Sequence, residues 1–251
     1  MDFKTVLEHH VLDHSLAYWT WGPFTFTLTR HLLAMWMGSV LLALTLFFSV
    51  RFSRKMQILI EAIVTYLRDE VVMKALGHSG KKYLHYFLTL FFFILALNLV
   101  GLIPGSATAT GNIAVTAALS LCTFALIHIA GIREQGLTHY VKSIVPQGLP
   151  SWLIPIMFPI ELLGFVTKTF ALSIRLFMNM IAGHIVILAF LGLIFIFGAL
   201  NPWIGIGTAP LSVAMSLFIY FLELVIVVPL QAFIFTFLTA LFVGSAIRPE
   251  H

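Results

Sequence analysis

Long apolar runs separated by short polar segments dominate this chain. A membrane-spanning helix needs about 20 apolar residues to cross about 30 Å of hydrocarbon. Three runs of that kind predict spans at 31–50, 83–103 and 112–132. Basic residues border these runs on one side, namely Arg51, Arg54, Lys55, Lys81, Lys82 and Arg133. Because basic flanks favour the cytoplasm, we expect segment 1–30 to lie outside the cell.

A different pattern occupies 55–77, where apolar and charged residues recur at helical spacing. Ile58, Ala62 and Val71 are expected on one face of this helix, and Glu61 and Asp69 on another. An amphipathic helix of this kind typically lies in the membrane interface. A short cytoplasmic helix packed on its neighbours explains the same pattern.

The last third of the chain is almost continuously apolar, with one interruption at 198–210. No turn signal divides 152–197, and a helix of that length extends about 70 Å at 1.5 Å per residue. Tilt in lipid reaches only about 40°, so such a helix needs another protein to lie against. We therefore expect 152–197 and 209–246 to form a long, steeply tilted hairpin against a partner, with the C-terminus in the cytoplasm.

Composition agrees with a chain solvated by lipid. Hydrophobic residues make up 60% of the sequence, charged residues 10%, and the mean hydropathy is +1.03. A soluble domain contains about 25% charged residues. The net charge of +4 is dispersed and forms no basic surface for nucleic acid. We predict an all-α integral membrane protein, a single membrane domain over 1–251 with about five crossing helices and one interfacial helix.

Arg175 is the only formally charged residue between Lys168 and Glu223. An isolated charge at the bilayer centre costs on the order of 3 kcal/mol on insertion scales. Arginine also cannot escape this cost by releasing its proton, as lysine can. The position therefore indicates a function that needs a permanent positive charge.

Other polar residues are arranged around this arginine at helical spacing. Glu161 and Lys168 precede it by two and one heptads on the same face, and Asn179 continues that face. His184 falls on roughly the opposite side, and Glu223 and Gln231 belong to the last helix. Two polar stripes divided by a fixed positive charge indicate two half-pores.

Four segments resemble subunit a of the rotary F-type ATP synthase. They are SIRLFMNMIAGHIV at 173–186, LQAFIFTFLTALFVGSA at 230–246, NLVGLIPG at 98–105 and VLDHSL at 11–16. The resemblance covers nearly the whole chain. It implies a non-catalytic stator subunit that carries protons to a ring of c subunits and couples their flow to ring rotation and ATP synthesis. It also implies peripheral-stalk b subunits as partners, no cofactor or metal, and a bacterial plasma or inner membrane.

The same resemblance implies roles for individual residues. Arg175 matches the essential arginine that faces the ring. The proton entry path corresponds to Asn179, His184, Glu223 and Gln231. The opposite access path corresponds to Glu161 and Ser173, with Lys168 in support. We also propose, as a hypothesis, that His184 and Glu223 form a direct proton-relaying pair.

The spacing of two of these residues departs from the family pattern. Glu223 precedes Gln231 by eight residues, whereas the family predicts seven. Either Pro229 absorbs the additional residue in a bulge, or Leu224 occupies the usual position of the acid.

Two other classes of protein use similar residues. A stand-alone proton-coupled secondary transporter or channel also carries buried polar groups, but it needs no ring. A membrane haem protein would use His85, His128 or His184 as axial ligands. The cluster of His9, His10 and His14 is more typical of a solvated helix end than of a metal site.

Overall fold

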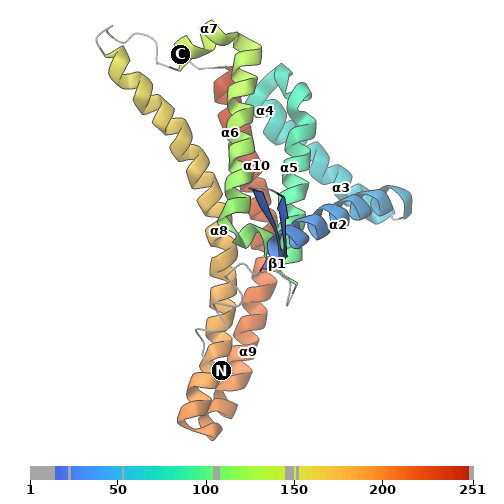
Figure 1. Ribbon diagram of the computed structural model, residues 1–251. Coiled ribbons are helices and arrows are strands. Elements are labelled where there is room, and N and C mark those ends of the chain that lie inside the picture. Colours follow the sequence, from blue (N-terminus) through green and yellow to red (C-terminus); the bar gives the residue numbers. More distant parts are fainter. Residues whose placement is uncertain are drawn as a thin grey trace. The chain divides into compact units, whose positions relative to one another are not determined.

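The computed structural model describes residues 15–21, 24–52, 54–103, 108–144, 150 and 153–248 (Figure 1). Most of these residues are helical. Within these described ranges, five helical runs are long and apolar enough to cross a membrane, namely His31–Phe48, Arg54–Gly101, Ile113–Gln135, Ile154–Leu200 and Pro202–Ile247. The predicted all-α membrane architecture is confirmed.

The described chain divides into two compact units. The first comprises 1–41, 94–112 and 176–231, and the second comprises 42–93, 113–175 and 232–251. Four of the described helices contribute residues to both units, namely α2 (Arg30–Phe52), α5 (Gly80–Gly101), α8 (Ile154–Leu200) and α10 (Val228–Ile247). Helix α8 is continuous over 47 residues, as the absence of a turn signal in 152–197 predicts.

The first unit opens with two strands, β1 (Ser15–Trp21) and β2 (Phe24–Thr29), which pair antiparallel. Strand β2 (FTFTLT) alternates threonine with phenylalanine or leucine, a period-2 pattern typical of strands, and β1 (SLAYWTW) is rich in aromatic residues. In the sequence they are separated by Gly22 and Pro23, a dipeptide typical of turns. This hairpin was not among the predicted elements, which were all helices.

The remaining elements of the first unit are helical. They are the start of α2 (Arg30–Phe52), the end of α5 (Gly80–Gly101), η3 (Ala109–Gly111), the second half of α8, α9 (Pro202–Leu222) and a π-helical turn, η4 (Glu223–Val227). The second half of α8 runs antiparallel beside α9 (Figure 1). At their closest approach Gly198 and Gly205 meet backbone to backbone, since neither residue carries a Cβ.

The turn between α8 and α9 is much shorter than the predicted interruption at 198–210. Helix α8 extends to Leu200, and α9 already begins at Pro202 rather than at the expected residue 209. Asn201 accepts a hydrogen bond from the Trp203 backbone N–H at 3.0 Å and so caps α9. Pro202 occupies the first helical position, where its missing N–H costs nothing. The Asn201 cap and the helix-initiating Pro202 together confine the turn between α8 and α9 to one residue, Asn201.

The second unit contains α3 (Arg54–Tyr66), a second π-helical turn η1 (Leu67–Val72), α4 (Met73–Leu76), η2 (Gly77–Ser79), α6 (Ile113–Gln135) and α7 (Leu137–Ser143). Gln135 joins α6 to α10, because its Nε2 donates to the backbone carbonyl of Ala246 at 2.7 Å. Tyr140 is buried, and its ring packs on Gly131, where a Cβ would collide with it.

Segment 55–77 is helical as predicted, but its faces differ from the prediction. Gly77 ends it with a positive φ of 60°, a conformation that glycine adopts without strain. Ile58 and Ala62, expected on the apolar face, lie in one groove with Glu61 and Asp69. The prediction of separate apolar and charged faces is therefore wrong at these positions. The spacing of 58, 61, 62 and 69 places all four side chains on one side of the helix.

Candidate functional site

The polar residues of the last helix come together through the π-helical turn η4. In an α-helix each residue turns about 100°, so eight residues overshoot two turns by about 80°. The turn at Glu223–Val227 absorbs one residue, which returns Glu223 and Gln231 to one side of the helix. Pro229 supports this turn, because it has no N–H to offer the Val225 carbonyl. Of the two alternatives, the bulge is confirmed, and Leu224 is 37% exposed whereas Glu223 is 3% exposed.

The carboxyl group of Glu223 borders a small cavity in the first unit. The cavity has a volume of about 10 Å³, enough for about one water molecule. Its polar lining consists of Asn98, Asn179, Glu223 and Gln231, and its apolar lining of Leu176, Met180, Val227 and Val228. In the described chain, neither carboxyl oxygen of Glu223 has a hydrogen-bond partner. A buried polar group of this kind is costly, so its presence needs a functional explanation.

A direct hydrogen bond joins the two long helices at this cavity. Asn179 Nδ2 donates to Gln231 Oε1 at 2.8 Å. Gln231 is buried, while Asn179 remains exposed at the edge of its helix. Helices α8 and α10 supply one amide each, so the bond fixes both side chains beside Glu223.

Space for Glu223 is created by a glycine on the facing helix. A Cβ at Gly183 would overlap the carboxyl group of Glu223. The neighbouring His184 forms no hydrogen bond with this group, because neither carboxyl oxygen of Glu223 has a partner among the described residues. The Nδ1 of His184 is instead 3.0 Å from the Met180 carbonyl oxygen of its own helix. The structure therefore does not contain the direct His184–Glu223 pair that we hypothesised, because Glu223 lies against the glycine beside it.

Asn98 is a site residue that the sequence analysis missed. It lies on α5, is 2% exposed, and accepts a hydrogen bond from Thr110 Oγ1 at 2.8 Å. The sequence does contain a feature that marks it as a candidate, because Asn98 is a lone amide inside an otherwise apolar span. Only the tertiary structure reveals that it faces Glu223.

The second unit holds the residues predicted for the opposite path. Ser173 is buried and donates from Oγ to Thr116 Oγ1 at 3.1 Å, which ties α8 to α6. The Lys168 ammonium lies over the rings of Phe165 and Phe242, at 5.4 and 5.8 Å from their centroids. Such cation–π contacts hold a lysine head group at a fixed place. Glu161 is half-buried on the same helix.

Arg175 is exposed on the surface of the chain and stands in the middle of α8. Within the described residues it forms neither an ion pair nor a side-chain hydrogen bond. Among those residues, no carboxylate of this chain neutralises its charge. A permanent charge on an apolar helix surface is suited to meet an acid on another molecule.

The arrangement around Glu223 is suited to carry protons. A carboxyl group can gain and release a proton, and the three surrounding amides can donate or accept hydrogen bonds. The predicted histidine cluster at His9, His10 and His14 lies outside the described residues.

Comparison with known proteins shows the family to which this chain is related. Residues 32–244 match the family model described as ATP synthase A chain. The chain is 42% identical to ATP synthase subunit a of Myxococcus xanthus, with 92% of this chain and 76% of that protein covered. It is 41% identical to the Chloroherpeton thalassium protein of the same description, covering 96% and 76%. A Prosthecochloris aestuarii relative, ATP synthase subunit a 2, is 42% identical, covering 98% and 80%.

These matches confirm the resemblance carried by the four segments, since they extend over nearly all of the helices described above. The chain therefore belongs to the family of ATP synthase A chains, as a subunit a of the membrane sector.

Proposed function

We propose that this chain is the stator that leads protons to and from a ring of c subunits and couples their flow to ATP synthesis. The observation that carries this proposal is the buried Glu223 carboxyl group with its amide neighbours Asn179 and Gln231. Such a titratable cluster in an apolar membrane protein is typical of a proton path. The chain itself catalyses no reaction in this proposal.

One half-channel uses the residues of the first unit. A proton enters past Asn179 and Gln231, is taken up by Glu223, and passes to a carboxyl group on the ring. His184 contributes a titratable group on the same helix, acting through water rather than by direct contact with Glu223. Asn98 orients the cluster through its hydrogen bond with Thr110.

The other half-channel uses residues of the second unit. Glu161 and Ser173 line it, and Lys168 supports it from its place above two aromatic rings. Protons leave through this path towards the cytoplasm when ATP is made. A proton that crosses the membrane potential releases about 2.3 kcal/mol per 100 mV.

Arg175 separates the two paths. When a protonated ring carboxyl group reaches it, the positive charge favours the ionised form, and the proton leaves. The same charge repels a proton that would pass straight from one half-channel to the other. Arginine suits this role because it remains charged throughout.

The partners and membrane follow from this role. We propose contact with the c ring and with the peripheral-stalk b subunits, in a bacterial plasma or inner membrane. The N-terminus faces outward and the C-terminus lies in the cytoplasm, as the basic flanks predict.

Inverted membrane vesicles that contain the whole complex test this proposal. Arg175→Ala is expected to abolish proton-driven ATP synthesis while the complex still assembles. Arg133→Gln is the matched control, since it removes an exposed cation that belongs to neither proposed path. Normal synthesis by Arg175→Ala vesicles would refute the proposal. Proton flow through the purified chain without a ring would favour a stand-alone channel instead.

A further inference from the structure

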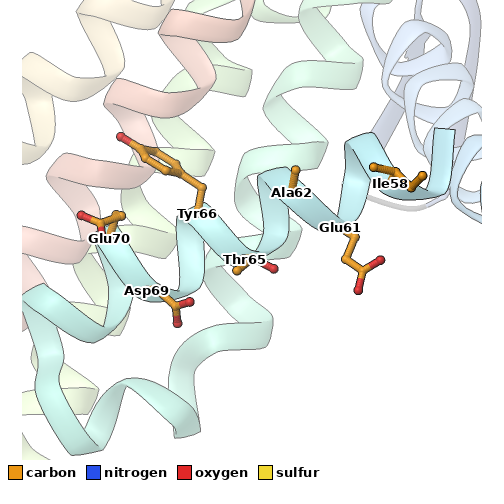
Figure 2. A pocket seen from close by; sticks show the side chains of 7 residues that line it. All are labelled: Ile58, Glu61, Ala62, Thr65, Tyr66, Asp69 and Glu70. Atoms are coloured by element: carbon orange, nitrogen blue, oxygen red, sulfur yellow. The ribbon is translucent and has the colours of Figure 1, made fainter. Parts of the chain in front are cut away.

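A shallow groove of about 490 Å³ runs along α3 and the following π-helical turn, outside the proton path (Figure 2). Its lining recurs at helical spacing and comprises Ile58, Glu61, Ala62, Thr65, Asp69 and Glu70, with Tyr66 beside them. These positions form one continuous face, because residues three and four apart are neighbours on a helix. From residue 58 to residue 70 the face extends about 18 Å.

This face is uncovered in the described chain. No residue of α3 is buried, and Ile58 and Tyr66 are 61% and 54% exposed. Tyr66 nevertheless fixes one side of the groove, since its ring lies 6.0 Å from that of Phe233 on α10. The groove is thus anchored to the rest of the second unit and still offers apolar surface.

The charge of the groove indicates which kind of partner can bind there. Its lining contains three carboxylates and no basic side chain. Asp69 pairs with Arg68, and Glu70 with Lys74, but both pairs are solvent-exposed, where a competing base can replace either cation. Glu61 has no ion pair among the described residues. Carboxylates that line a surface attract basic side chains.

We propose that this groove binds a basic amphipathic helix of another subunit of the same complex. The separation of Glu61 from Asp69 is about 12 Å along the helix axis. A partner helix therefore needs lysine or arginine residues seven or eight positions apart. Small apolar residues between them pack against Ile58 and Ala62. The inference requires only that the chain is one subunit of a larger assembly, and it does not depend on the proton path.

Photo-crosslinking in the intact purified complex tests this contact. The probe is p-benzoylphenylalanine placed at Thr65, in the middle of the groove. Met56 is the control position, because it is 48% exposed but does not line the groove. We expect Thr65 to capture a helical peptide of another subunit with two bases at the predicted spacing, and Met56 to capture chiefly lipid.

Charge variants decide whether the acids recognise that peptide. The triple variant Glu61→Gln, Asp69→Asn, Glu70→Gln keeps side-chain size, and we expect it to lower the crosslink yield at least tenfold. Raising the salt concentration is expected to lower the yield of the unaltered complex as well. Capture of lipid at Thr65, capture of a peptide without bases, or an unchanged yield in the triple variant would each overturn the proposal. Proton flow is measured separately in the same vesicles.

Discussion

Gly183 of α8 lies directly against the carboxyl group of Glu223, so that the two positions share one space. The glycine has no side chain, and the carboxyl group occupies the volume that a Cβ would take. The contact explains how an acid from one helix reaches the cavity beside Asn179 and Gln231. In the proposed proton path, the position of the Glu223 carboxyl group therefore depends on Gly183, a residue that cannot itself carry a proton.

Gly183→Ala is expected to displace the Glu223 side chain and to slow proton flow strongly. Forcing a methyl group into a packed site typically destabilises a protein by about 1 to 3 kcal/mol. Passive proton flow through vesicles lacking the soluble catalytic sector measures the effect. Gly207→Ala is the matched control, because a Cβ at Gly207 meets no atom within 4 Å. Equal rates for both variants would contradict the packing argument.

The Asn179–Gln231 hydrogen bond is expected to couple the two residues energetically. Asn179→Leu and Gln231→Leu should each slow proton flow without stopping it. The double variant should be less impaired than the two single effects predict together, since the bond is lost only once. A hydrogen bond between membrane helices is worth about 0.6 kcal/mol on average, and heat inactivation of the complex measures this term. Strict additivity in both measurements would show that the bond has no role.

The π-helical turn offers a test by changing chain length. Deleting Val225 should convert η4 into regular α-helix and leave Glu223 seven residues before Gln231, about 20° short of two turns. We therefore expect a detectable proton flow in this variant. Inserting one alanine after Val225 should instead rotate Glu223 out of the cavity and abolish the flow. If the deletion is as inactive as the insertion, the turn has a role besides alignment.

Ser173 is expected to act through its hydroxyl group rather than through its size. Ser173→Ala removes the hydrogen bond to Thr116, which is worth about 1 kcal/mol, and should slow proton flow. Ser173→Thr keeps a hydroxyl group and should retain more of the flow. Proton flow and thermal inactivation are measured on the same vesicles. A loss of stability without any change in flow would assign Ser173 a purely structural role.

Much of this protein was determined by its sequence alone. Apolar run length predicted the membrane helices, and the absence of turn signals predicted the continuous α8. The lone Arg175 and the polar residues at helical spacing identified the candidate site. These properties are local, because hydrogen bonds within a helix and the lipid around it act on each segment separately.

The tertiary structure decided which polar groups meet. The π-helical turn moved Glu223 into line with Gln231, and Asn98 joined the cavity from α5, a helix distant in the sequence. His184 was excluded from contact because Gly183, its neighbour, provides the space that Glu223 occupies. Helical periodicity predicts faces along one helix, but the partner of each face depends on packing between helices. That packing is set by the shapes of side chains from several segments at once, and no single stretch of sequence contains it.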